Sequence, residues 1–302
     1  MRPGPLSCFA LLATGCATAG SDGVRPGPAV AGGAASLRFR WPEGFQARVT
    51  LVHREERPGS PAASARATHR LVTERAGGAI RVRVLETEAE GDVPDLEANV
   101  RIAEALVQVV TREGAYLRTE GLEKALEVLG TEGADSREVA RGALARIAEL
   151  DWEVTAGAWA GRTLAAGHPL LRQFPGSVPL LPAVPALLDV EQSYVGAVPC
   201  EEGAARECVE LSWRGIPGEA ARADALRQLR IEARDEGGSF PELEGVAARV
   251  EAHLVAEPGT LIPHRLDIAE ELRITVRQPG GDAVDLVEHS EDHYRFAPEQ
   301  EL

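Results

Sequence analysis

Alternation of apolar and polar residues at both ends of the chain is the feature that most constrains its fold. The alternating segments are residues 37–41, 47–53, 68–74 and 80–84 near the start, and 246–256, 261–268, 272–277 and 283–296 near the end. Successive side chains of a strand point to opposite faces, so each segment predicts a strand with one packed face and one wet face. Such strands are typical of antiparallel hairpins.

The middle of the chain has a different spacing. Residues 105–111 and 115–119 predict a hairpin, after which 121–129 and 135–150 repeat apolar residues at helical intervals. Asp135 or Ser136 can cap the second of these helices. Further on, residues 219–234 predict a polar helix with one apolar side.

The two sets of strands each have an apolar face that needs cover, and the helices between them can supply it. We therefore predict an α+β fold: a curved antiparallel sheet or half-barrel from the N- and C-terminal strands, with helices packed on its concave face. Residues 36–302 are expected to form a single domain with a helical middle at about 120–165. The outline is similar to that of exported lipoprotein-carrier and lipid-binding lipoproteins, although no motif in the body matches theirs.

Residues 165–189 are rich in Pro, Gly and Leu. Because proline fixes its own backbone and lacks an N–H group, this stretch is expected to be neither regular helix nor central strand. It is either an exposed connector or an apolar flap.

The first residues have the pattern of an export signal. Arg2 precedes an apolar stretch at residues 6–13, and small residues lead into a cysteine. The segment Leu12-Ala13-Thr14-Gly15-Cys16 resembles the lipobox of bacterial lipoproteins. That resemblance implies a signal peptide at 1–15, cleavage before Cys16 and lipid on its thiol. The alternatives are an ordinary cleavable signal or a free N-terminal coil.

The residues after Cys16 predict a tether. Residues 16–35 are small, Gly- and Pro-rich and nearly uncharged, so they have little to pack, and a coil of about 20 residues spans roughly 25 Å. In a Gram-negative cell, the family's rule retains at the inner membrane lipoproteins with aspartate after the lipidated cysteine, so Ala17 at that position favours the outer membrane. The expected location is therefore the cell envelope, in the outer membrane and facing the periplasm or the surface, with the lipid-bearing membrane as one partner.

Two cysteines remain in the body. Cys200 and Cys208 bracket a polar loop between the strand-like segments of a hairpin at 192–213. A disulfide there suits an oxidising compartment and agrees with export. A reactive pair or two reduced cysteines are the alternatives. Because the closed loop is short, the stabilisation is expected to be about 2 kcal/mol.

Charge and missing motifs exclude several classes of function. With 47 acidic and 32 basic residues, the net charge is −15, and no basic cluster interrupts it, which disfavours nucleic acid as a partner. The sequence has no G-x-S-x-G elbow, no S-x-x-K set and no phosphate-binding glycine loop. We therefore predict no cofactor and do not favour an enzyme.

Two groups of residues are candidates for binding. Trp152 and Trp159 can form a ligand wall or simply pack in the core, and Phe174 begins a segment that can gate a cavity. His289, Glu291 and His293 would share one face of a strand, where they can bind zinc. The alternative for this second group is a solvated face paired with Arg273 or Arg277 on the neighbouring strand.

The expected function follows from location and architecture. We predict a membrane-tethered envelope lipoprotein that binds a lipid-like or other apolar ligand without enzymatic activity. The first alternative is a scaffolding lipoprotein that binds an envelope protein. The second is a hydrolase with a site assembled from distant carboxylates or histidines.

Overall fold

The computed structural model describes residues 33–299 except 132, 202–204, 236–241 and 278–280. The lipobox-like segment and most of the expected tether therefore lie outside the described residues. The last residues of that tether, Ala34 and Ala35, belong to β1 (Ala34–Ser36), which pairs with β7 (Thr163–Ala165). No helix in the described ranges has both the length and the apolar character needed to cross a membrane.

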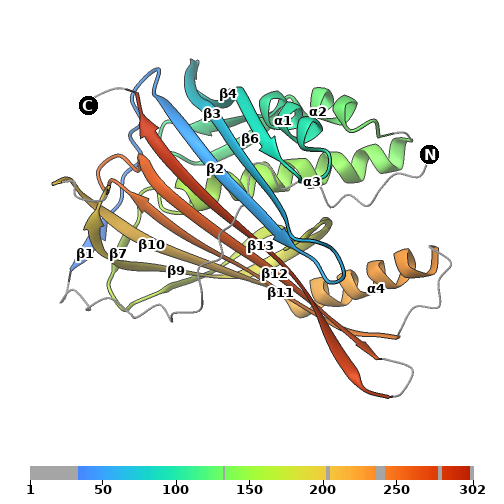
Figure 1. Cartoon of the computed structure of the whole chain (residues 1–302). Helices are drawn as coiled ribbons and strands as arrows, with labels where there is room; N and C mark the ends of the chain where they lie inside the picture. The colour runs from blue at the N-terminus through green and yellow to red at the C-terminus, as the bar shows by residue number, and fades with distance from the viewer. Residues whose placement is uncertain (1–32, 132, 202–204, 236–241, 278–280, 300–302) are drawn as a thin grey trace.

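One curved antiparallel sheet of eleven strands dominates the fold (Figure 1), and its order is β6-β5-β4-β3-β2-β13-β12-β11-β10-β9-β8. The strands are β2 (Gln46–Glu56), β3 (Ala63–Ala76), β4 (Ala79–Gly91), β5 (Val107–Thr111), β6 (Tyr116–Glu120), β8 (Leu170–Val178), β9 (Leu181–Pro199), β10 (Glu207–Pro217), β11 (Glu242–Ala256), β12 (Pro263–Arg277) and β13 (Ala283–Pro298). The sheet does not close, because β6 and β8 remain at its two edges.

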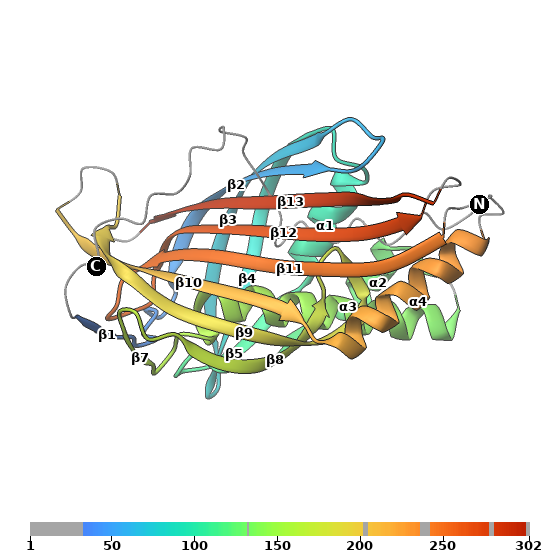
Figure 2. The same ribbon diagram turned by 90° about the horizontal axis from the view of Figure 1, so that it is seen from below.

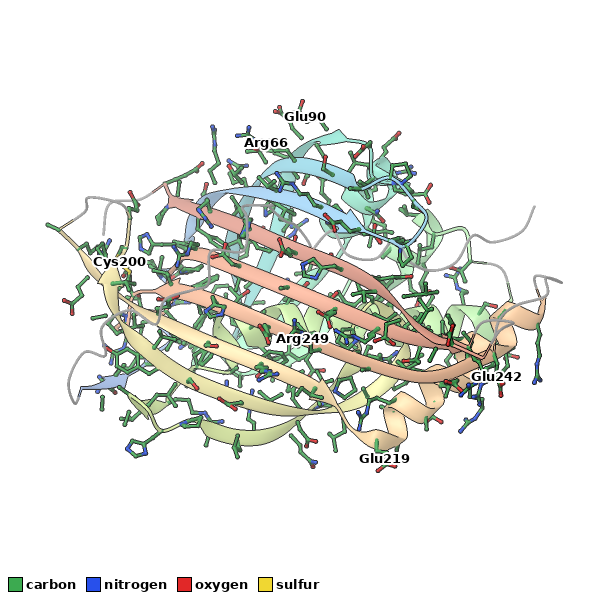
Figure 3. All side chains as sticks on the ribbon, turned by 60° about the horizontal axis from the view of Figure 1, so that its bottom comes forward. Arg66, Glu90, Cys200, Glu219, Glu242 and Arg249 are labelled. Atoms are coloured by element: carbon green, nitrogen blue, oxygen red, sulfur yellow. A yellow bond between two sulfur atoms is a disulfide. The ribbon has the colours of Figure 1, made fainter. Side chains whose placement is uncertain are left out.

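The N- and C-terminal strand sets meet at the centre of this sheet. β13 pairs with β2, so that Tyr294 lies opposite Leu51 and Asp292 lies opposite His53. The α+β fold class predicted from the alternating segments is thereby confirmed. Figure 3 shows the outer face, where charged side chains form cross-strand ion pairs such as that of Arg249 with Glu271, at 2.9 Å.

The helices are α1 (Leu96–Ala105), α2 (Leu122–Val128), α3 (Ala134–Trp152), the short π-helix η1 (Glu153–Gly157) and α4 (Glu219–Asp235). The first three lie together on one face of the sheet, and α4 lies at one end (Figures 1 and 2). Helix α3 contacts β8 and β9 near one edge of the sheet and β5 and β6 at the other. It therefore bridges the concave face from edge to edge.

The segment between β1 and β2 packs into the space between the concave face of the sheet and α3, which we call the trough. Phe39, Trp41 and Phe45 are buried there, and residues 37–41 alternate in burial as expected. These residues do not join the large sheet, however. The N–H of Leu37 donates to the Arg162 carbonyl at 2.7 Å, so the expected strand is an extended lining segment.

Several local expectations were wrong. Helix α3 begins after Gly133 without a side-chain cap, so neither Asp135 nor Ser136 caps it. Helix α1 was not predicted. The expected strands 261–268 and 272–277 form one continuous strand, β12.

The Pro-rich stretch was also misjudged, because most of it forms β8 and the start of β9. Pro175 lies on the edge strand β8. Pro185 lies in the part of β9 that pairs with β8 but not with β10, and Pro182 lies at a register shift where it pairs with neither strand. Each proline therefore avoids a position where both neighbouring strands need its missing N–H group. From α3, Arg146 donates to the Ser177 hydroxyl at 2.9 Å and to the Pro182 carbonyl at 3.0 Å, which fixes this hairpin to the helix.

Candidate functional site

The candidate site is the trough between the concave face of the sheet and α3. Alternate residues of the central strands point into it, and most are apolar, as with Leu51, Leu254 and Leu266. A partly enclosed cavity of about 70 Å³ remains in the trough. Its walls come from the central strands, from α1 and α3, and from the segment between β1 and β2.

Aromatic rings form one wall of this cavity. Trp41 and Trp152 meet edge to face with ring centroids 5.5 Å apart, and Phe39 packs against Trp152 at 5.4 Å. Trp152 is fully buried, and its indole N–H is satisfied because it donates to the Gly114 carbonyl at 2.7 Å, which also fixes the orientation of the ring. Such a wall is rigid because each ring is held by its neighbours.

Of the three residues predicted as ligand contacts, one lines the cavity and two do not. Trp152 lines the cavity. Trp159 is buried, and its N–H donates to the Val154 carbonyl at 2.9 Å; it belongs to the core but is not part of the cavity lining. Phe174 is buried on β8 under the Arg172 guanidinium, also away from the lining. Their roles in binding stay predictions.

Polar residues interrupt the apolar inner face at its centre. Asp292 and Ser290 on β13 are buried, Glu270 on β12 lies opposite Ser290, and Asp151 at the end of α3 faces them and lines the cavity. Both carboxylate oxygens of Asp292, one of Asp151 and the hydroxyl of Ser290 have no hydrogen-bond partner. Leaving such a group unsatisfied costs about 1–3 kcal/mol.

Burial sets the protonation of these groups. It raises the pKa of Asp151 and of Asp292 well above the ordinary range, and the nearby Glu270 carboxyl raises both further. Burial raises the pKa of Glu270 to about 7, although the Leu180 backbone N–H opposes this shift. The trough therefore holds three carboxyls that resist ionisation.

Two histidines lie in the same trough. His53 on β2 and His69 on β3 are buried, and burial lowers the pKa of each to about 4. Both are therefore neutral at pH 7, and His69 lines the cavity. Neither histidine is among the candidate binding residues identified from the sequence.

Sequence reasoning missed the buried half of β13. The residues proposed for metal binding, His289, Glu291 and His293, lie on the outer face and are half-buried. His289 contacts Glu291 at 2.7 Å, whereas His293 contacts Asp267 at 2.5 Å instead. A metal site at these residues stays a prediction. The signal for Ser290 and Asp292 was their period-two spacing with the apolar Tyr294 and Phe296.

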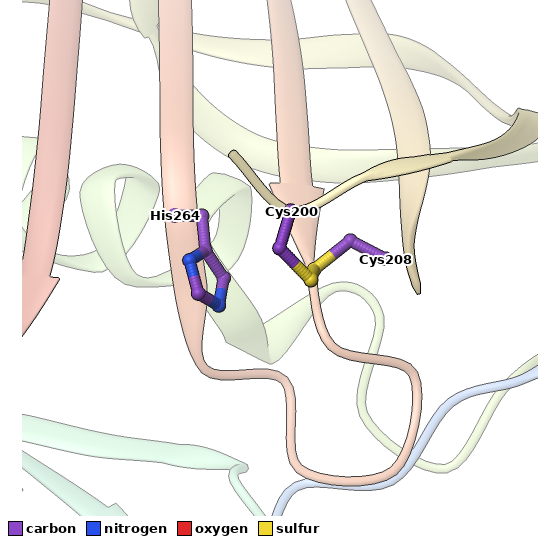
Figure 4. Close-up of side chains that lie close together, drawn as sticks. All are labelled: Cys200, Cys208 and His264. Atoms are coloured by element: carbon purple, nitrogen blue, oxygen red, sulfur yellow. A yellow bond between two sulfur atoms is a disulfide. The ribbon is translucent and has the colours of Figure 1, made fainter. Parts of the chain in front are cut away.

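The predicted disulfide is present between Cys200 and Cys208. His264 lies beside it (Figure 4), and these donor atoms lie close enough together to share a metal ion if the sulfurs were reduced. His264 Nε2 lies 3.2 Å from Glu257. Burial by itself would raise the pKa of Glu257, but hydrogen bonds from His264 and Thr260 outweigh it and lower that pKa. With the disulfide closed, this cluster ties the hairpin to β12.

Comparison with known proteins gives little. No protein-family model matches the sequence, and no curated protein sequence matches it. A structure of lipovitellin described for its lipid–protein interactions aligns with a TM-score of 0.46 and 10% identity, over 87% of this chain and 26% of that one. A LolA superfamily protein, NE2245 from Nitrosomonas europaea, aligns with a TM-score of 0.19 and 9% identity, over 87% of this chain and 90% of that one. This chain therefore spans about a quarter of the lipovitellin chain, and at these TM-scores we infer nothing from either likeness.

Proposed function

We propose that this chain is an exported, lipid-anchored protein that binds an apolar ligand in the trough between its sheet and α3. The observation that carries the binding proposal is the cavity under α3, whose walls include Trp41, Trp152 and Phe296. Small-molecule sites are usually concave and lined mostly by apolar groups.

The cavity is too small for a lipid-like ligand unless the protein opens. An engineered apolar cavity that binds benzene has a volume of about 150 Å³, roughly twice the 70 Å³ present here. A lipid-like ligand must therefore separate α3 from the floor of the trough. The architecture favours such a movement, because the described contacts of α3 with the sheet are concentrated on strands at or near its edges.

Filling the cavity tests the proposal. Ala148 on α3 is fully buried and lines the cavity, so Ala148→Leu places extra methyl groups in the space. Ala140→Leu is the matched control, because Ala140 is buried on the same helix but packs against α1 and α2. Both substitutions overpack the protein by about 1–3 kcal/mol, so stability alone cannot separate them.

The measurement is lipid extracted from purified protein and identified by mass spectrometry. We expect ligand with the wild type and with Ala140→Leu, and loss of it with Ala148→Leu. Absence of any extractable ligand from the wild type, together with no binding of a fluorescent fatty acid, would refute the proposal.

The anchor is tested separately. The proposal rests on the lipobox-like segment ending in Cys16 and on the disulfide, which suits an oxidising compartment. In a bacterial host, Cys16→Ser should abolish labelling by radioactive palmitate and move the protein from the membrane fraction to the soluble fraction. Unchanged labelling would contradict lipidation at this residue.

A further inference from the structure

The buried carboxyls of the trough are not explained by packing. Asp292 is 0% exposed and Ser290 is 1% exposed, and both belong to the inner face of β13. Asp151 is 8% exposed and reaches the same region from the end of α3. Glu270 lies across from Ser290 on the neighbouring strand, so the group comes from three elements distant in sequence.

The atoms that face this region lack partners within the protein. Both oxygens of Asp292, Oδ2 of Asp151 and the Ser290 hydroxyl accept and donate no hydrogen bond. In the part of the chain that the structure describes, no arginine or lysine forms an ion pair with Asp151, Glu270 or Asp292. Native proteins satisfy nearly all buried polar groups, so such a concentration of orphaned acceptors marks a place for a ligand.

The carboxyls adjoin the cavity. Asp151 lines it together with Trp152 and Tyr294. Asp292 lies behind that lining, opposite Ile268, which is itself a wall residue. The cavity therefore has a mostly apolar lining with one carboxyl, Asp151, behind which Asp292 lies; we call these carboxyls, with Glu270, the acidic corner. The one arginine of the lining, Arg83, pairs with Glu74.

We propose that this acidic corner binds the primary ammonium group of an amphiphile whose apolar part occupies the trough. The inference rests on the proposed function and adds the class of head group. An ammonium group supplies three N–H donors, and its positive charge favours the ionised form of these carboxyls, whose pKa values burial otherwise raises. A hydroxyl group supplies one donor and no charge. Within the described residues, these carboxyls do not gather their oxygens closely enough to share a metal ion.

The test compares amphiphiles of one chain length by isothermal titration calorimetry at pH 7.5: decylamine, decan-1-ol, decanoate and decyltrimethylammonium. The trimethyl compound keeps the charge but has no N–H donor, so it separates hydrogen bonding from charge. We expect wild-type protein to bind decylamine about tenfold or more tightly than each of the other three, as charge-assisted hydrogen bonds require.

Two variants locate the effect. Asp151→Asn and Asp292→Asn keep the shape of each side chain but cannot form the carboxylate that pairs with an ammonium group, and each should reduce decylamine affinity about tenfold and leave decan-1-ol affinity unchanged. Asp135→Asn, at the exposed start of α3, is the control and should bind as the wild type does. If Asp151→Asn fails to fold by circular dichroism, Asp292→Asn decides.

The outcomes separate this inference from the proposed function. Equal binding of all four compounds, or unchanged selectivity in the folded variants, overturns the ammonium site but leaves apolar ligand binding intact. Binding of none of the four overturns both.

Discussion

Replacing Glu270 by glutamine should stabilise the protein at neutral and alkaline pH. The pKa of Glu270 is raised by burial from 4.5 to about 7. Between these two values the folded protein holds a proton that the unfolded chain has already lost, so the wild-type free energy of unfolding falls as pH rises. At about 1.4 kcal/mol for each pKa unit, the loss reaches about 3 kcal/mol once the pH exceeds 7.

Glutamine cannot ionise, so the variant escapes this loss. It can still accept the hydrogen bond from the Leu180 backbone N–H, because an amide oxygen replaces the carboxyl oxygen. We therefore expect the two proteins to be equally stable near pH 4, with the variant gaining progressively up to about 3 kcal/mol at pH 8. The pKa values of Asp151 and Asp292, which face this residue, are themselves raised, first by burial and then by Glu270.

Urea denaturation followed by tryptophan fluorescence at half-unit steps from pH 4 to 8.5 measures the difference. The matched control is Glu271→Gln, since Glu271 is on the outer face and pairs with Arg249 and Arg273. Removing exposed ion pairs should cost about 0–1 kcal/mol and bring no gain at high pH. A Glu270→Gln variant that is less stable than the wild type at pH 8 would refute the reasoning.

Three further predictions follow from other features. Burial lowers the pKa of His69 to about 4, so between pH 6.5 and pH 4 the unfolded chain gains a proton before the folded protein does, and the free energy of unfolding falls by about 3 kcal/mol. The urea midpoint of His69→Gln should therefore decline less over that range than the wild-type midpoint. A parallel decline would contradict this reasoning. Gly114 has φ +90, and an added Cβ would lie 2.7 Å from Phe39 Cγ, so Gly114→Ala should lower stability by at least about 1–3 kcal/mol. The control is Gly130→Ala, where the added Cβ meets open space and only backbone strain from the positive φ lowers stability. Reduction of the Cys200–Cys208 disulfide should lower the melting temperature by an amount equivalent to about 2 kcal/mol, and an unchanged melting curve in dithiothreitol would count against the bond.

Much of the fold was predictable because strands with one wet face carry a clear alternation. The helices α3 and α4 and the hairpin of β5 and β6 were likewise visible from spacing. Helix α1 was missed, and the cap expected for α3 was wrong because Gly133, which has no side chain, occupies the capping position. The prolines of β8 and β9 led to a wrong prediction of irregular structure. A proline is compatible with a strand wherever no neighbouring strand needs its N–H group, and only the sheet topology shows which positions those are.

The candidate site was missed for a related reason. Glu270 interrupts the apolar face of β12, and that interruption made one strand look like two. Ser290 and Asp292 interrupt the apolar face of β13 in the same way, but the residues selected from the sequence included His289 and His293, which alternate with them along the strand. Residues that break a local pattern are the ones expected at functional sites, since they are retained despite their cost to stability. Their convergence depends on pairing between distant strands, which no single segment reveals.

The pairing of β13 with β2 has a consequence for how the protein is made. The first hairpins emerge from the ribosome with one side of β2 unpaired, and its partner is among the last strands to be synthesised. An open strand of this kind is a template for pairing with another chain, and contacts so distant in sequence form slowly. The export proposed above, in an unfolded state, would postpone folding until the whole chain is present. The topology of the sheet thus favours a chain that completes its folding after its translation rather than during it.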